Sequence, residues 1–215
     1  MNTSRTDLPD TLPLFPLPGA LLLPGAELPL NIFEPRYVQM VEDALAQPRL
    51  IGMIQPMQSL NGQSRRELAQ VGSAGRISGF QETGDGRYLI VLKGVCRFRI
   101  LEECESDALY RKARVDFSPY HADLTEHAHA DDVDTGELTS ALRDYLSRNG
   151  LTSDMAAISD TPPQTLINAI SADCPFTNSE KQALLEARTL EDRCAALVAL
   201  LSMSSIGRQQ KEYVQ

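Results

Sequence analysis

Cysteine and histidine are scarce in this 215-residue sequence, and tryptophan is absent. The four cysteines, Cys96, Cys104, Cys174 and Cys194, lie far apart and form no Cys-x-x-Cys pair. Such pairs are typical of structural zinc sites and thiol-exchange centres, so we expect neither here. The sequence also opens without the apolar segment of a secretory signal, and we therefore expect a cytoplasmic protein whose cysteines are reduced thiols.

Long hydrophobic runs are missing as well. The longest, such as Ala195–Leu201, are far shorter than the about 20 residues that a membrane-spanning helix needs, so no membrane partner is expected. Acidic residues outnumber basic ones by 29 to 20, which gives a formal net charge of -9. A nucleic-acid surface needs surplus Lys and Arg to neutralise phosphates, so this charge argues against nucleic acid as the main partner.

Sequence motifs for nucleotide binding and nucleophilic catalysis are absent too. No glycine is followed by lysine, which excludes the P-loop that holds nucleotide phosphates, and no Gly-x-Ser-x-Gly motif occurs. Ser179 and Lys181 stand close in sequence, but they fall at the predicted start of a helix, where a helix cap explains them. We therefore expect no enzymatic activity and no cofactor.

The three histidines all lie in one acidic stretch and offer an alternative function. His127 and His129, followed by Asp131 and Asp132, supply imidazole and carboxylate donors of the kind that transition metals bind. A metal site needs ligands held rigidly by their surroundings, and few large apolar residues order this stretch. We favour a mobile tether, with a metal-binding protein or a hydrolase using these histidines as the alternative.

The distribution of charge and apolar residues divides the chain into three parts. Residues 119–136 contain no Lys or Arg and predict a solvated acidic linker. Residues 10–118 contain short apolar runs separated by Gly and Pro, which are typical of an all-β barrel or sandwich. Residues 137–207 show apolar residues at helical spacing and predict a helical subdomain.

Six apolar runs in the first part predict strands. They are Leu12–Leu17, Leu50–Gln55, Val71–Phe80, Tyr88–Leu92, Cys96–Leu101 and Arg111–Phe117. Because Tyr88–Leu92 is apolar on both faces, it predicts a central strand covered on both sides. A hairpin turn is expected at Gly84-Asp85-Gly86 and another turn at Gly94.

Alternation within these strands sorts side chains by face. Phe98 and Ile100 are expected to point into the core, together with Ala113, Val115 and Phe117. The basic residues between them are expected to point outward; they are Arg97, Arg99, Lys112 and Arg114. They would either bind an anionic partner or, in the favoured interpretation, pair with Glu102, Glu103 or Asp116 on neighbouring strands.

Apolar residues at helical spacing predict one helix inside the β region and several after it. The inserted helix begins at Pro35, and its apolar stripe consists of Tyr37, Met40, Val41, Ala44 and Leu45. In the last part, Thr177 and Glu180 predict a capping box, and Gly207 is expected to end the final helix.

Residues 12–38 contain three distinctive motifs: Leu-Pro-Leu-Phe-Pro-Leu at 12–17, Pro-Gly at 24–25 before Leu-Pro-Leu at 28–30, and Asn-Ile-Phe-Glu-Pro-Arg-Tyr at 31–37. Together these motifs resemble the N-terminal substrate-binding domain of Lon proteases. Shorter matches follow in family order, so that the ordered similarity spans about 105 residues and is far more specific than one short motif.

This resemblance implies an α+β fold in which a PUA-like β pseudobarrel with one inserted helix precedes an all-α helical subdomain. It also implies unfolded polypeptide segments or partner proteins as ligands, in protein quality control or regulated proteolysis. The sequence holds neither the ATPase nor the Ser-Lys protease motifs of Lon, so we predict a non-catalytic, ATP-independent binding module. RNA binding is a further alternative, because PUA-like barrels occur in RNA-binding proteins. The oligomeric state, a monomer or a weak dimer, is left open.

Five prolines between Leu12 and Leu30 prevent this apolar segment from pairing throughout as regular strands. We expect edge segments, bulges or turns there, with an open apolar groove beside the inserted helix. Arg36 is expected either to bind a carboxylate of a partner or to pair with Glu34. If the aromatic residues do not line the groove, we expect them to pack in the core, with Phe33 and Tyr37 fixing the helix to the barrel. The candidate partner-binding residues are Phe15, Leu22, Phe33, Glu34, Arg36 and Tyr37.

Overall fold

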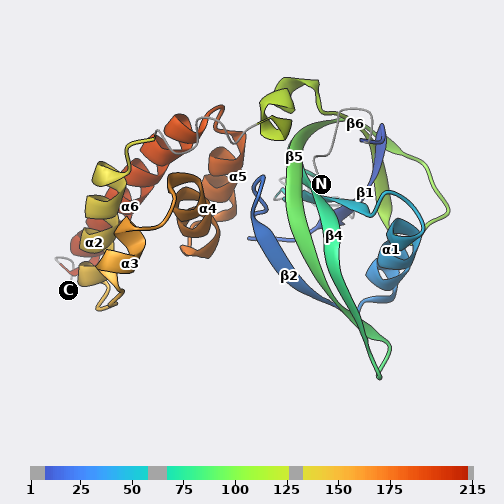
Figure 1. The fold of residues 1–215 in the computed structure, drawn as a ribbon, viewed down its shortest axis with the longest axis horizontal. Coiled ribbons are helices and arrows are strands. Elements are labelled where there is room, and N and C mark those ends of the chain that lie inside the picture. The colour runs from blue at the N-terminus through green and yellow to red at the C-terminus, as the bar shows by residue number, and fades with distance from the viewer. Residues whose placement is uncertain (1–7, 58–66, 126–132, 213–215) are drawn as a thin grey trace. The chain divides into compact units, whose positions relative to one another are not determined.

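The computed structural model describes residues 8–57, 67–125 and 133–212 (Figure 1). The chain divides into two compact units, Met1–Glu126 and His127–Gln215. Strands build the first unit and helices the second, which confirms the predicted α+β class. In the part of the chain that the structure describes, no helix is both long and apolar enough to cross a membrane.

Among the described residues, six strands form one mixed sheet that closes into a barrel. Their order is β2-β5-β4-β3-β1-β6, and β6 also pairs with β5, so five strands complete a ring while β2 stays outside it. The β1–β3 pairing is parallel and the others are antiparallel. The strands are β1 (Thr11–Pro16), β2 (Glu27–Ile32), β3 (Leu50–Ile54), β4 (Val71–Thr83), β5 (Arg87–Cys104) and β6 (Arg111–Asp116).

The long strand β5 joins the ring to β2. Its first part pairs with β2 and its second part with β6, while β4 runs along its other side. The sequence predicts two strands here with a turn at Gly94, and this prediction is wrong: Gly94 lies inside β5. A Cβ atom at Gly94 would collide with the carbonyl oxygen of Leu23, so the glycine serves a close approach between backbones.

The barrel interior is filled around Phe98, which is fully buried. Gly52 and Gly72 make room for its ring, because a Cβ atom at Gly72 would lie 2.5 Å from Phe98 Cζ. The predicted inward positions Ala113 and Val115 are also buried. The predicted inward face of these strands is therefore confirmed.

The proline-rich opening of the chain pairs only where its prolines permit. In β1, Thr11–Leu14 pair with β6 and Leu14–Pro16 pair with β3, so the strand changes its partner along its length. β2 is an edge strand. It is not among the six strands predicted from the sequence, because Pro29 interrupts its apolar run. Both arrangements agree with the prediction of edges and irregular pairing.

The prediction that Arg97 is exposed is wrong, because only 3% of this residue is accessible to solvent. Its Nε and Nη2 atoms donate to the Asp123 carboxylate at 2.9 and 2.7 Å, and its backbone N–H donates to the same group at 2.9 Å. Asp123 belongs to a 3-10 helix, η2 (Ser118–Leu124), which covers the outer face of β5. The first part of the predicted linker is therefore folded structure.

Two further surface predictions of the barrel have different outcomes. The first part of β5 is not covered on both faces, because Leu89 is 42% exposed. Pairing of basic residues across strands is confirmed for Arg114, whose Nε donates to Glu102 at 3.0 Å. In addition, Arg111 pairs with Glu103.

The second unit consists of five helices among its described residues. The capping box of Thr177 and Glu180 is confirmed. The prediction that Gly207 ends the last helix is wrong, because this helix continues to Glu212. A glycine inside a helix lowers its stability by about 1 kcal/mol but does not force the helix to end. The helices are α2 (Gly136–Arg148), α3 (Met155–Ser159), α4 (Pro163–Asp173), α5 (Asn178–Glu186) and α6 (Leu190–Glu212).

Candidate functional site at helix α1

The candidate residues gather around α1 (Pro35–Leu45), the helix inserted between β2 and β3. Pro35 suits the first helical turn because its missing N–H would have no intrahelical partner there. The apolar stripe of α1 is buried against the barrel as predicted, with Met40 and Val41 fully enclosed. This packing fixes the helix, so the residues at its two ends are held in defined positions.

The six predicted site residues separate into a buried and an exposed group. Phe15 is 5%, Leu22 1% and Tyr37 7% exposed, so the prediction that these three side chains line an open groove is wrong. All three contribute to the same core cluster instead. The residues that reach the surface are Phe33, Glu34 and Arg36.

Arg36 lies over the Tyr37 ring, which in turn contacts the Phe15 ring in a tilted arrangement. The Phe15 and Tyr37 ring centroids are 4.3 Å apart, and the Arg36 guanidinium carbon lies 4.5 Å from the Tyr37 centroid. Its Nε and Nη2 atoms donate to the same Glu34 oxygen at 2.9 and 2.6 Å, which confirms the predicted pair. Burial raises the pKa of Tyr37, so the ring stays neutral beneath the exposed ion pair.

Phe33 does not staple α1 to the barrel, because it is 61% exposed. It stands in the short connection between β2 and α1, and Tyr37 makes the contact with the barrel that was predicted for both residues. Phe33 thus presents an aromatic ring to solvent, whereas the nearby Tyr37 is buried and Glu34 and Arg36 pair with each other. Such an exposed ring beside a fixed arginine and carboxylate suits contact with an apolar side chain of a partner.

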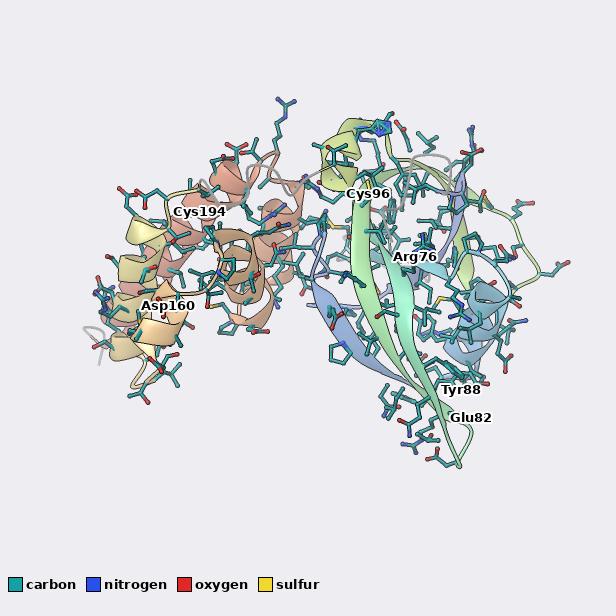
Figure 2. All side chains as sticks on the ribbon, viewed as in Figure 1. Arg76, Glu82, Tyr88, Cys96, Asp160 and Cys194 are labelled. Atoms are coloured by element: carbon teal, nitrogen blue, oxygen red, sulfur yellow. The ribbon has the colours of Figure 1, made fainter. Side chains whose placement is uncertain are left out.

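The β4–β5 hairpin extends this surface. Its three-residue turn ends at Gly86, whose φ of 79° is the left-handed conformation that glycine favours, as predicted. Near the turn, the rings of Phe80 and Tyr88 lie 5.0 Å apart, and Figure 2 shows Tyr88 at this end of the hairpin. Tyr88 Oη donates to Glu42 of α1 at 2.8 Å, which raises the pKa of Tyr88 and ties the hairpin to the helix.

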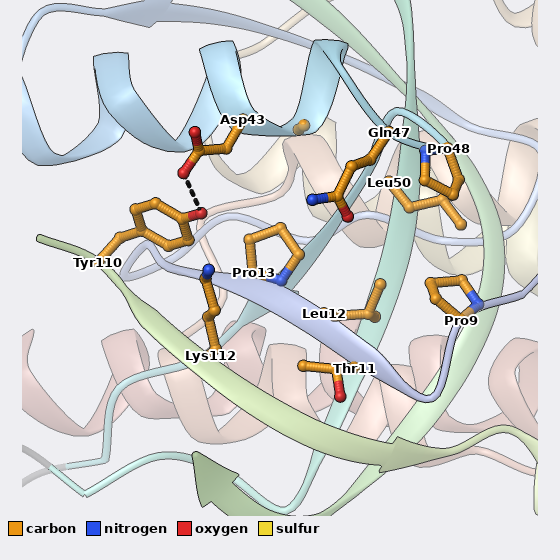
Figure 3. Close-up of a pocket in the computed structure, with 11 residues that line it drawn as sticks. Pro9, Thr11, Leu12, Pro13, Asp43, Gln47, Pro48, Leu50, Tyr110 and Lys112 are labelled. Carbon is orange, nitrogen blue, oxygen red and sulfur yellow. Dashed lines mark hydrogen bonds between the residues drawn. The ribbon is translucent and has the colours of Figure 1, made fainter. Parts of the chain in front are cut away.

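A small cavity lies at the other end of α1 and holds none of the six predicted residues (Figure 3). Tyr110 Oη donates to Asp43 at 2.6 Å on its wall, and Lys112 Nζ lies 5.1 Å from the Tyr110 ring. Burial, reinforced by Asp43, raises the pKa of Tyr110. The volume of about 120 Å³ admits a few water molecules and is far below that of ordinary ligand pockets.

His127 and His129, the candidate ligands of the alternative metal-binding interpretation, lie outside the described residues. Within residues 8–57, 67–125 and 133–212, no group of three or more His, Cys, Asp or Glu side chains could hold a metal ion. The third histidine, His121, lies in η2.

Comparison with known proteins places residues 11–203 in a match to a family described as the ATP-dependent protease La (LON) substrate-binding domain. Lon protease 2 of Myxococcus xanthus is 26% identical, over 93% of this chain and 24% of the relative. Lon protease 2 of Sorangium cellulosum is 28% identical, over 95% of this chain and 28% of the relative. The chain thus spans about a quarter of the length of these curated relatives.

Solved structures share the fold. A Lon N-terminal domain protein from Xanthomonas campestris has a TM-score of 0.62 at 24% identity and covers 88% of this chain, with 97% of its own length matched. The N-terminal domain of the Mycobacterium avium complex Lon protease also has a TM-score of 0.62, at 17% identity, covering 89% of this chain and 98% of its own. The barrel followed by helices is therefore a known architecture.

Proposed function

Because this chain belongs to the family of Lon substrate-binding domains, we propose that it recognises unfolded polypeptide segments or partner proteins without cleaving them. The observation that carries the proposal is the exposed group Phe33, Glu34 and Arg36, held by the packing of α1 against the barrel. An aromatic ring beside a fixed ion pair offers contact to both apolar and charged side chains of an extended partner. We place this recognition in protein quality control or regulated proteolysis.

We also propose that the chain neither catalyses a reaction nor uses ATP. The family match extends over the substrate-binding domain, and the sequence lacks a Gly-Lys step for nucleotide phosphates. The RNA alternative loses part of its support, because Arg97 is buried against Asp123 and Arg114 pairs with Glu102. A binding module fits these observations better than an enzyme or an RNA-binding protein.

The proposal is tested by binding of a fluorescent, permanently unfolded polypeptide, such as reduced and carboxymethylated casein, measured by fluorescence anisotropy. Phe33→Ala is expected to raise the Kd about tenfold, as loss of an interface anchor does. Arg36→Ala is expected to weaken binding with little change in Tm, because its pair with Glu34 is exposed. The matched control is Leu101→Ala, which removes an exposed apolar side chain from the distant part of β5.

Besides a failure of the original chain to bind unfolded polypeptide, two results would overturn the proposal. One is saturable binding of the unfolded polypeptide that is equally strong in Phe33→Ala, Arg36→Ala and Leu101→Ala proteins. The other is fragmentation of the polypeptide during incubation with the purified chain, with or without ATP, seen by mass spectrometry.

A further inference from the structure

The strand β2 has one open edge. It pairs with β5 along Glu27–Ile32, and no other described strand lies along its second side. An open edge presents backbone N–H and C=O groups that another extended chain can pair with. The exposed positions on β2 are Glu27, Pro29 and Asn31.

The hydrogen bond just before β2 fixes which of its residues face that edge. Gly94 N–H donates to the carbonyl oxygen of Ala26 at 2.8 Å. Bonded and non-bonded pairs alternate along an antiparallel ladder, so Leu28 and Leu30 bond to β5. Pro29 and Asn31 then direct their backbone groups outward. Pro29 fits this assignment, because it has no N–H to lose from the β5 ladder.

Two apolar side chains of β2 remain partly exposed and can contact an apolar neighbour at the open edge. Leu28 and Leu30 are only partly buried and pack against the core cluster that contains the α1 stripe. A strand beside β2 would place every second side chain over these two leucines. The same strand would run on to Phe33, which directly follows β2 and belongs to the candidate site.

We propose that the open edge of β2 binds an extended polypeptide segment by strand addition, with apolar side chains at alternate positions covering Leu28 and Leu30. This inference rests on the proposed function and specifies how the partner is held. A second copy of the chain is a poorer occupant, because two β2 edges paired together would each lack the Pro29 donor. A foreign segment supplies its own complete set of donors to the outward carbonyl groups of β2.

The first test uses the full chain and a short fluorescent peptide in which valine alternates with serine. Asn31→Pro removes an outward N–H without removing a bond to β5, and it is expected to raise the peptide Kd about tenfold. Asn31→Thr keeps the N–H and is the matched control, expected to bind as the original chain does. Circular dichroism and Tm identify any loss of folding in the proline variant.

The second test leaves the protein unchanged and alters the peptide. N-methylation of alternate peptide amides removes the donors on one edge of the bound strand, whereas N-methylation of the other set leaves them. Strand addition predicts that one methylated peptide loses binding and its counterpart retains it. Equal affinity of both methylated peptides, or unchanged affinity of Asn31→Pro protein, would overturn the inference.

The outcomes separate this inference from the function on which it rests. If the original chain binds neither the peptide nor unfolded casein, the proposed function fails. If it binds both and neither edge change has an effect, strand addition alone fails. A concentration-dependent dimer that Asn31→Pro abolishes, seen by sedimentation together with no peptide binding, would assign the edge to a second copy and overturn the proposal.

Discussion

Arg97 and Asp123 form an ion pair in which both side chains are almost completely buried. Removing one partner of a buried pair leaves the other charge desolvated, so Asp123→Asn is expected to lower the free energy of unfolding by about 3–5 kcal/mol. Urea denaturation measures this change. Arg114→Ala, which breaks an exposed pair, is the control and should change stability by less than about 1 kcal/mol. Equal effects of the two substitutions would contradict the prediction.

Gly94 is a second residue whose substitution has a defined cost. An added methyl group would collide with the backbone of Leu23, which cannot turn aside as a flexible side chain can. Gly94→Ala is therefore expected to destabilise the fold by about 1–3 kcal/mol, measured as a fall in Tm. At Gly84 no described atom lies within 4 Å of an added Cβ, so Gly84→Ala should leave Tm nearly unchanged. A larger effect at Gly84 than at Gly94 would refute this interpretation.

At the scale of elements, Tyr110 links the segment before β6 to α1 through Asp43. Tyr110→Phe is expected to lower stability by about 1 kcal/mol at neutral pH, because it removes one hydrogen bond. Its raised pKa also has a pH consequence. The stabilisation is fully present below the unfolded tyrosine pKa of about 10 and is lost as pH rises through the higher folded pKa.

The measurement for Tyr110 compares the stability of the two proteins across the alkaline range. The difference between the original chain and Tyr110→Phe should persist up to about pH 10 and shrink above it. Tyr37 and Tyr88 also have raised pKa values but are common to both proteins, so the comparison isolates Tyr110. A difference that grows with pH would contradict the assigned direction.

Local patterns predict the elements better than they predict contacts between distant residues. The apolar stripe of α1 and the Glu34–Arg36 pair follow from neighbours along the chain. β2 is missed because Pro29 argues against a central strand, while its actual position at an edge is a property of the whole sheet. Arg97 is given the correct face of β5, but no local signal shows that η2 covers that face.

The same limit applies to the candidate site. The resemblance and the charge spacing direct attention to Glu34 and Arg36, and both reach the surface. Hydrophobicity alone cannot separate Phe15 in the core from Phe33 in solvent, because each follows a short apolar segment. Asp43 and Tyr110 are 67 positions apart in sequence, so only the fold brings them together.

At the scale of the whole molecule, the Arg97–Asp123 pair defines where the first unit ends. Because η2 is held on β5, limited proteolysis is expected to cut first after Thr125 within the remaining predicted linker. Mass spectrometry of the first fragments locates the cut. In Asp123→Asn protein, cleavage should extend into Ser118–Leu124. First cleavage inside that segment of the original chain would contradict the boundary.

The pairing of β1 with β6 also has a consequence for biosynthesis. Thr11 lies opposite Arg114, so the strand that is made first completes the ring only with the strand that is made last. The β4–β5 hairpin forms from neighbouring residues, whereas ring closure bears the loop entropy of about a hundred residues. During translation Leu14–Pro16 of β1 can pair with β3 early, but Thr11–Leu14 stay without their β6 partner until β6 leaves the ribosome. The nascent barrel therefore passes through an open state whose unpaired strands resemble the unfolded segments that we propose it binds.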